Sequence, residues 1–240
     1  MPLVFSPLSE AVLDLPPKRL FPRYAFIMRQ LGRPPSLDLT MNAEVVRLLE
    51  NRGFRAIDAD GTTGGKDYLE RILGLIRGTG FTIAIFSDRT RAGALTNIAL
   101  ELGFAALCGK PLVVAKTPKA SAPSDLKRTD WIEYDETDPA QFHRKLSQAI
   151  DEIERLCDWE GDLLQTSLEA RSPDCAVALE RANKGFFLSG DKRFIEAAER
   201  ILDLLSGVDE GPAIGDLERL RSETRTFIRQ ARACLDAGRR

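Results

Sequence analysis

The side chains best suited to chemistry in this sequence are two polar groups on one predicted helix. Asn97 and Glu101 are four residues apart, so they share a face of the helix expected from Leu95 to Cys108. Glu101 is the single charged residue of that helix. A carboxylate among apolar neighbours is destabilising unless it is hydrogen-bonded or used in a reaction. Two interpretations stay open: Glu101 acts on a substrate, or it belongs to a narrow solvent-facing stripe or pairs with a lysine.

The rest of the residue inventory limits the mechanism. The chain has one histidine, His143, far from any nucleophile motif, and four cysteines without a C-x-x-C spacing. A Ser-His-Asp triad and a structural zinc site are therefore disfavoured, and we expect no metal. Proton transfer would then depend on carboxylates. We interpret the cysteines as reduced thiols in the cytoplasm.

Alternating strands and helices must position Glu101. Short apolar runs separated by amphipathic segments predict an α/β fold: a doubly wound, flavodoxin-like, five-stranded parallel sheet with right-handed crossovers. The preferred strand order is 2-1-3-4-5. The expected strands are residues 24–28, 54–57, 81–86, 111–115 and 131–134, and the expected helices between and after them are residues 39–51, 67–77, 95–108 and 138–157.

The pattern changes along the chain in three parts. Residues 1–23 contain five prolines and predict an extended N-terminal arm, residues 24–157 form the α/β domain, and residues 158–240 predict a C-terminal all-helical domain for oligomerisation or partner docking. A separate helix is expected from Asp162 to Glu169. The helices on either side of Ser189-Gly190-Asp191 resemble a tetratricopeptide hairpin. One such unit is too few for a solenoid, so we favour an ordinary helical appendage.

Ligands of such sheets bind beyond the carboxyl ends of the strands, where the strand order reverses. Basic residues follow these ends and would hold phosphates if they converge; the alternative is scattered solvated charge. The basic residues concerned are Arg29, Arg89, Arg91, Lys116 and Lys119.

The glycine-rich segment Gly61–Lys66 follows the second strand. It is not a P-loop, because Asp60 stands where the first glycine is required and Asp67 stands where Ser or Thr should hold magnesium. We predict a mobile loop over the pocket, with its backbone N–H groups near a helix start. The absence of G-x-G-x-x-G disfavours a dehydrogenase.

The segment after the third strand resembles a known superfamily. Ser87-Asp88, Asn97, the run Glu101-Leu102-Gly103-Phe104-Ala105 and Gly109-Lys110-Pro111 are similar to the nucleoside 2-deoxyribosyltransferase-like superfamily and to the related TIR-like NAD hydrolase domains. The resemblance covers about residues 24–135. It implies that Glu101 acts at the anomeric carbon, as nucleophile or by holding ribose hydroxyls, and that Asp88 orients the base or sugar. Transferases often carry an Asp shortly before the glutamate, and residues 91–95 have none, which favours hydrolysis over transfer.

The expected function is therefore hydrolysis of the N-glycosidic bond of a nucleotide, with NAD as first candidate and a nucleoside monophosphate as second. A buried carboxylate stabilises the oxocarbenium-like transition state, so no cofactor is needed. The alternative is a non-catalytic TIR-like module that senses a nucleotide or scaffolds partners. The expected catalytic residues are Glu101 and Asp88, and the expected substrate-binding residues are Arg29, Gln30, Asp60, Gly64, Gly65, Ser87, Arg89, Asn97 and Lys116.

Composition bounds the partners. A net charge of −2 argues against a general nucleic-acid or anionic-membrane binder, so no direct nucleic acid is expected. No run reaches the roughly 18 apolar residues of a membrane span, and the first residues lack the basic segment of a secretory signal. We expect a cytoplasmic protein that forms a homo-oligomer or docks a protein partner through its C-terminal helices. The resemblance adds bacterial antiviral defence as its setting.

Overall fold

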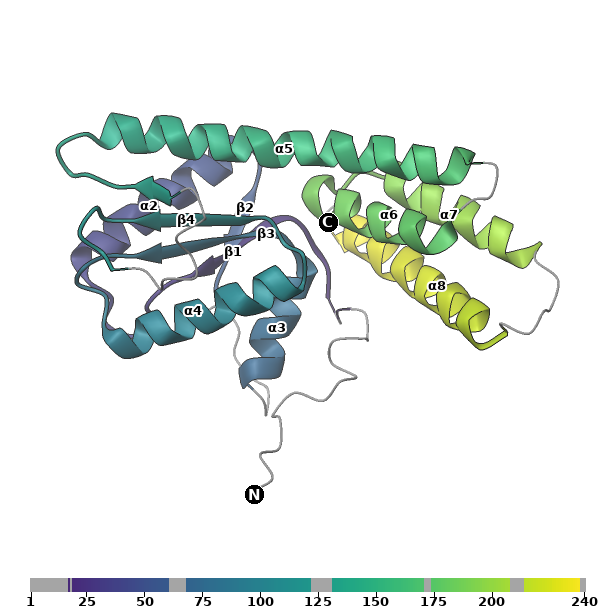
Figure 1. Cartoon of the computed structure of the whole chain (residues 1–240), viewed down its shortest axis with the longest axis horizontal. Helices are drawn as coiled ribbons and strands as arrows, with labels where there is room; N and C mark the ends of the chain where they lie inside the picture. The colour runs from purple at the N-terminus through teal and green to yellow at the C-terminus, as the bar shows by residue number, and fades with distance from the viewer. Residues whose placement is uncertain are drawn as a thin grey trace, which may run out of the picture.

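The computed structural model describes residues 17, 19–60, 68–121, 131–170, 174–207 and 214–237. At its centre lies a five-stranded sheet in the order β2-β1-β3-β4-β5, and every neighbouring pair is parallel (Figure 1). The predicted strand order and fold class are confirmed. The strands are β1 (Phe21–Met28), β2 (Arg55–Ile57), β3 (Thr79–Phe86), β4 (Leu112–Lys116) and β5 (Trp131–Glu133).

Helices cover both faces of the sheet, which makes three layers. Successive side chains of a strand point to opposite faces, so β1 places Ala25 and Ile27 in one core and Phe26 and Met28 in the other. The first core is closed by α2 (Ser36–Asn51) and α5 (Pro139–Glu169), and the second by α3 (Tyr68–Gly78) and α4 (Ala92–Leu107). Glu101 therefore lies on a helix that packs against the sheet, as expected.

Several elements begin earlier than the sequence predicts. β1 starts at Phe21, inside the stretch assigned to the arm, and α4 starts at Ala92 rather than Leu95. β3 starts at Thr79, two residues before the predicted strand, and includes Gly80. A Cβ on Gly80 would lie 2.7 Å from the carbonyl oxygen of Phe187, so only glycine permits this approach of a later helix.

The expected division of residues 138–169 into two helices is wrong. α5 is one helix through Gly161, and its buried residues recur at intervals of three and four along its whole length. Continuous burial outweighs a glycine, which weakens a helix by only about 1 kcal/mol relative to alanine. The boundary expected between Cys157 and Asp158 thus falls inside a helix. The buried residues of α5 are Phe142, Leu146, Ile150, Ile153, Cys157, Glu160, Leu164 and Leu168.

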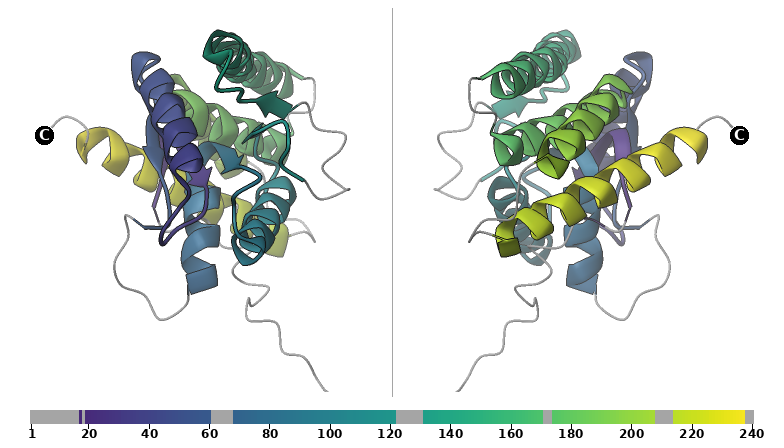
Figure 2. Two further views of the ribbon diagram at one scale, coloured as in Figure 1. Left: turned by 90° about the vertical axis from the view of Figure 1, so that its left-hand side faces the viewer. Right: turned by 90° about the vertical axis from the view of Figure 1, so that its right-hand side faces the viewer.

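The C-terminal helices pack against the amino ends of the central strands of the sheet. They are α6 (Cys175–Ser189), α7 (Arg193–Ser206) and α8 (Ile214–Ala237). α6 contacts α5, β1 and β3, and its end lies at the amino ends of the strands, where a Cβ on Gly190 would be 3.4 Å from Pro22. One hydrophobic core continues from the sheet into these helices. The right-hand view of Figure 2 looks onto this extension, with α8 running obliquely across it.

No helix within the described ranges is long and apolar enough to cross a membrane.

Candidate functional site

The candidate site lies at the carboxyl ends of the parallel strands, which we call the carboxyl edge of the sheet. The C-terminal helices contact the opposite, amino ends of the strands. The strands are parallel, so the segments that follow them meet at this edge. Most of the predicted binding residues do lie there, whereas Gly64 and Gly65 fall outside the described residues. The predicted residues at this edge are Arg29 and Gln30 after β1, Asp60 after β2, Ser87, Asp88 and Arg89 after β3, and Lys116 at the end of β4.

Arg29 is paired with a carboxylate. Its guanidinium donates to Asp58 Oδ2 at 2.6 and 3.1 Å, and Asp60 lies 4.0 Å away. Asp58 Oδ1 also accepts the backbone N–H of Asp60. This ion pair closes the β1 end against the β2 end. The positive charge of Arg29 is therefore largely balanced before any phosphate binds.

Gln30 is buried and uses both ends of its amide. Its Nε2 donates to the carbonyl of Arg33, and its Oε1 accepts the backbone N–H of Arg91 at 2.9 Å. The Arg91 guanidinium in turn donates to the carbonyls of Leu31 and Gly32. Gln30 and Arg91 thus join the loop after β1 to the start of α4, so Gln30 has a structural role that the sequence did not indicate.

A buried hydrogen-bond chain fixes the turn between β3 and α4. The backbone N–H of Ser87 donates to Thr90 Oγ1 at 2.7 Å, and the Thr90 hydroxyl donates to Asp38 Oδ2 at 2.8 Å. Asp38 is almost fully buried, and its Oδ1 has no hydrogen-bond partner among the described residues. Sequence reasoning missed Asp38. Its only signal is its place in the first turn of α2, where carboxylates are common for electrostatic reasons.

Asp88 is exposed beside this turn. Its backbone N–H donates to Thr117 Oγ1, and the Thr117 hydroxyl donates back to Asp88 Oδ1 at 3.0 Å. The pair links the ends of β3 and β4 and leaves Asp88 exposed to solvent. Such a carboxylate is placed to accept hydrogen bonds from a ligand at the sheet edge.

Lys116 is almost wholly enclosed. Its ammonium donates to the carbonyls of Thr117 and Pro118, pairs with Glu133 at 3.0 Å and lies 4.7 Å from the centre of the Trp131 ring. These contacts fasten β4 to β5. Arg29, Arg91 and Lys116 are therefore engaged by other described residues and are not free to converge on a phosphate. Arg89 differs, because its guanidinium makes no hydrogen bond or ion pair with another described residue.

Glu101 lies far from this edge, along the axis of α4. It comes nine residues after Ala92, the start of α4, which places it about 13.5 Å along the helix axis. Cys108, seven residues further on, shares its side of the helix and lies within electrostatic range of Arg77 on α3. A ligand that touches both Asp88 and Glu101 must extend along α4 for more than two turns.

The ionisation of Glu101 is shifted. Burial raises the pKa of its carboxyl from 4.5 to about 7. No hydrogen bond or charged partner among the described residues offsets that burial. The interpretation that Glu101 pairs with a lysine is therefore not supported. A carboxyl that is partly protonated at neutral pH suits general acid–base work, and such groups gather at functional sites.

The rest of α4 differs from expectation. A helix with a single charged residue is expected to be buried on most sides, but only Ile98, Leu102 and Ala105 are fully buried. Its outer face is exposed and carries no charge: Leu100 is 48% exposed and Leu107 is 78% exposed. Asn97 lies on the exposed side, one turn nearer the sheet edge than Glu101. The exposed residues of α4 are Ala92, Gly93, Thr96, Asn97, Leu100, Gly103, Ala106 and Leu107.

No protein-family model, no curated protein and no solved structure matches this chain. The resemblance of the Glu101 segment to deoxyribosyltransferase-like and TIR-like domains thus stays a prediction. Within the described residues, no group of three or more His, Cys, Asp or Glu side chains is placed to hold a metal ion.

Proposed function

We propose that the protein hydrolyses the N-glycosidic bond of a nucleotide, with NAD as first candidate and a nucleoside monophosphate as second. One observation carries the proposal: the Glu101 carboxyl is partly buried, makes no hydrogen bond or ion pair with another described residue, and has a pKa of about 7. When ionised, it would stabilise positive charge that develops on the ribose. Asp88 and Asn97 would orient the substrate, and Arg89 would bind a phosphate.

The distance between the two predicted catalytic residues favours the longer candidate. Asp88 lies at the sheet edge and Glu101 more than two helical turns below it. A dinucleotide spans such a distance more readily than a mononucleotide does. This is the structural argument for NAD over a nucleoside monophosphate.

The direct test is release of a free base from NAD and from a panel of nucleotides, followed by chromatography. Glu101→Gln removes the charge with little change of shape, and Glu152→Gln is the matched control on the exposed side of α5. We expect base release by the wild type and by Glu152→Gln, and loss of about two orders of magnitude or more in Glu101→Gln. Activity that persists in Glu101→Gln contradicts the assignment of this residue.

The pH profile gives a second readout of the same site. If Glu101 acts as a carboxylate, base release should rise with pH as the group ionises, with a midpoint near its pKa of about 7. A profile that is flat between about pH 6 and about pH 8 argues against a role for its ionisation.

A second candidate is a non-catalytic module that senses a nucleotide or scaffolds partners. The pairing of Arg29 with Asp58 and of Lys116 with Glu133 supports the scaffolding form, because these contacts build a rigid edge and leave little free positive charge for a phosphate. For the sensing form, calorimetry detects nucleotide binding that Glu101→Gln weakens, and for the scaffolding form it detects none. In neither case is base released, even by concentrated protein.

Self-association or docking of a protein partner is part of the proposal. Its support is the apolar surface left exposed on two helices: Leu100 and Leu107 on α4, and Trp159, 59% exposed, on α5. Surfaces of this kind often mark interaction sites. Light scattering after size-exclusion chromatography measures the mass in solution, and replacement of Leu107 or Trp159 by aspartate identifies the surface used.

A further inference from the structure

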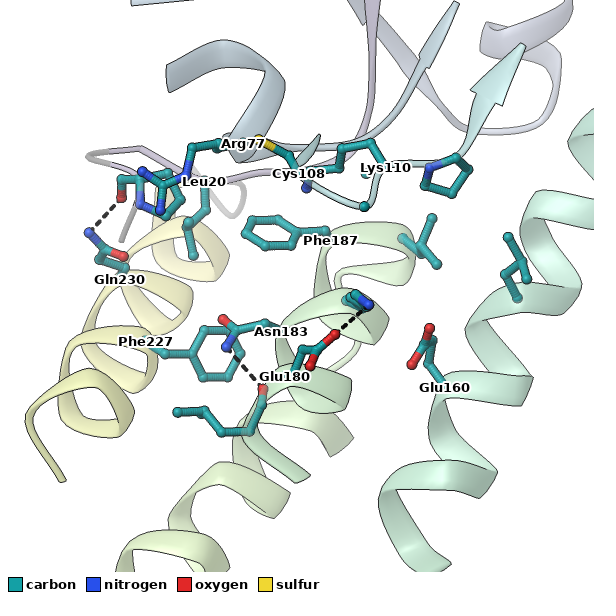
Figure 3. Close-up of a pocket in the computed structure, with 18 of the residues that line it drawn as sticks. Leu20, Arg77, Cys108, Lys110, Glu160, Glu180, Asn183, Phe187, Phe227 and Gln230 are labelled. Atoms are coloured by element: carbon teal, nitrogen blue, oxygen red, sulfur yellow. Dashed lines mark hydrogen bonds and ion pairs between the residues drawn. The ribbon is translucent and has the colours of Figure 1, made fainter. Parts of the chain in front are cut away.

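A cavity of about 900 Å³ lies at the edge of the sheet opposite the candidate site (Figure 3). One wall comes from the α/β domain, with Arg77 at the end of α3 and Cys108 to Pro111 between α4 and β4. The other walls come from α5, α6 and α8 of the helical extension. The predicted function gives this cavity no role. It is a separate space formed by segments that are distant in the sequence.

Three basic side chains line the cavity around Lys110: Arg77 and Lys110 come from the α/β domain, and Lys184 comes from α6. Burial lowers the pKa of Lys110 to about 7, and the positive charges of Arg77 and Lys184 act in the same direction. Lys184 Nζ lies beside Gly109, the residue before Lys110: a Cβ on Gly109 would be 4.0 Å from Lys184 Nζ. Glu180 balances the charge of Lys184, whereas Lys110 pairs with no carboxylate of the described residues. A bound anion would stabilise the charged form of Lys110.

The acidic residues of the cavity do not supply such an anion to Lys110. Glu160 is paired with Arg181 at 3.1 Å, Glu180 with Lys184 at 2.5 Å, and Glu223 with Arg219 at 3.7 Å. Lys110 donates instead to the carbonyl oxygen of Thr79 at 2.6 Å. Its ammonium therefore makes no ion pair with a carboxylate of the described residues and has further N–H groups for a ligand.

Apolar surface lies directly beside this ammonium. The centre of the Phe187 ring is 4.2 Å from Lys110 Nζ, and Phe227 lies deeper on the α8 side, as Figure 3 shows. Leu20 and Leu179 extend the apolar lining. Small-molecule sites typically combine such a lining with a few well-placed polar groups. The lining suits an aromatic or aliphatic body, and the basic wall suits a negative group.

We propose that this cavity binds a small organic anion, whose negative group contacts Lys110 and Lys184 and whose apolar body lies against Phe187 and Phe227. The ligand would bridge the α/β domain and the helical extension, because the four residues belong to both parts. The site is independent of the proposed chemistry at Glu101. Its occupation and the hydrolysis of a nucleotide are separately measurable.

The test uses two fluorescent probes that share an aromatic body. 8-Anilinonaphthalene-1-sulfonate carries a sulfonate, and N-phenyl-1-naphthylamine has none. Both are titrated into the full chain and into Lys110→Gln, Lys184→Gln and the control Lys145→Gln, which lies exposed on α5. We expect one sulfonate probe per chain, with the dissociation constant raised about tenfold by Lys110→Gln and about threefold by Lys184→Gln, and unchanged by Lys145→Gln.

The uncharged probe should bind more weakly than the sulfonate and equally to all four proteins. Circular dichroism verifies that each variant is folded. If Lys110→Gln does not fold, Lys184→Gln decides, because that side chain is 34% exposed and can be replaced without disturbing the core. The proposal is overturned if the folded lysine variants bind the sulfonate as tightly as the wild type, or if the uncharged probe binds as tightly as the sulfonate.

Discussion

Glu160 of α5 and Arg181 of α6 form an ion pair, with Arg181 Nη1 3.1 and 3.3 Å from the two carboxylate oxygens, in a position that is otherwise apolar. Glu160 occupies a core position of α5, between Cys157 and Leu164. The pair joins the two helices of the extension that pack most extensively. Because both groups are largely withdrawn from water, each depends on the other for its charge balance.

Glu160→Gln should therefore destabilise the protein, because it leaves the Arg181 charge without its partner. We expect the free energy of unfolding to fall by about 1–3 kcal/mol in urea titrations. The double variant with Arg181→Gln should lose less than the sum of the two single variants. Additive losses would mean that the two side chains are not coupled.

Glu101→Gln should have the opposite effect, and one that depends on pH. An acid whose folded-state pKa is raised destabilises the fold increasingly as pH rises from its ordinary value of 4.5 through about 7. Removing the charge should thus stabilise the protein more at about pH 8 than at about pH 5, by on the order of 2 kcal/mol. Chemical unfolding at both pH values measures this. The control Glu152→Gln should show no such difference, and equal behaviour of the two variants would mean that Glu101 is solvated.

Gly80→Ala should weaken the contact between the sheet and the helical extension. The added methyl group would meet backbone atoms of Phe187 at 2.7 and 3.2 Å, and backbone cannot move aside easily. We expect a loss of about 1–3 kcal/mol of unfolding free energy. Gly74→Ala in α3 is the matched control, since its methyl group meets nothing within 4 Å and should stabilise the helix by about 1 kcal/mol. A neutral Gly80→Ala would mean that α6 does not approach β3 so closely.

Gln30→Met should destabilise the protein without creating a cavity. The substitution keeps the volume but leaves the backbone N–H of Arg91 and the carbonyl of Arg33 without their hydrogen bonds. A loss of about 2 kcal/mol is expected from thermal or urea unfolding. Gln148→Met, on the exposed side of α5, should change stability little. If both variants behave alike, Gln30 is free to serve a ligand instead.

The sheet could be predicted because its signals are local. Runs such as Phe81–Phe86 are apolar except for Thr82, as is typical of strands covered on both faces, and the strand–helix alternation leaves few possible topologies. The start of β3 was predicted too late because Gly80 was left outside the strand, since a glycine in a sequence does not say whether it ends an element or makes room for a neighbour. The three-four spacing from Cys157 to Leu168 was the better signal for α5.

The candidate site could be predicted only in part. Parallel strands bring Arg29, Asp88 and Lys116 to one edge, and that much follows from topology. The hydrogen-bond and ion-pair partners of these side chains do not follow from topology. Whether Lys116 meets Glu133 depends on the register of β4 and β5, which single-strand patterns leave open. The cavity beside Lys110 was beyond reach because its walls come from separate segments of the chain between Pro17 and Gln230.

Because α5 is one unbroken helix, it fixes both the rotation and the distance between the residues of its first half and those of its second half. Each residue of an α-helix adds about 100° of rotation and about 1.5 Å of rise. One residue inserted near Gly161 would therefore turn Leu164 and Leu168 by about 100° relative to Phe142 and Leu146, and α6 could no longer contact both α5 and the sheet. Changes of chain length are expected to be tolerated in the connections between helices but not between Ile153 and Leu164 of α5.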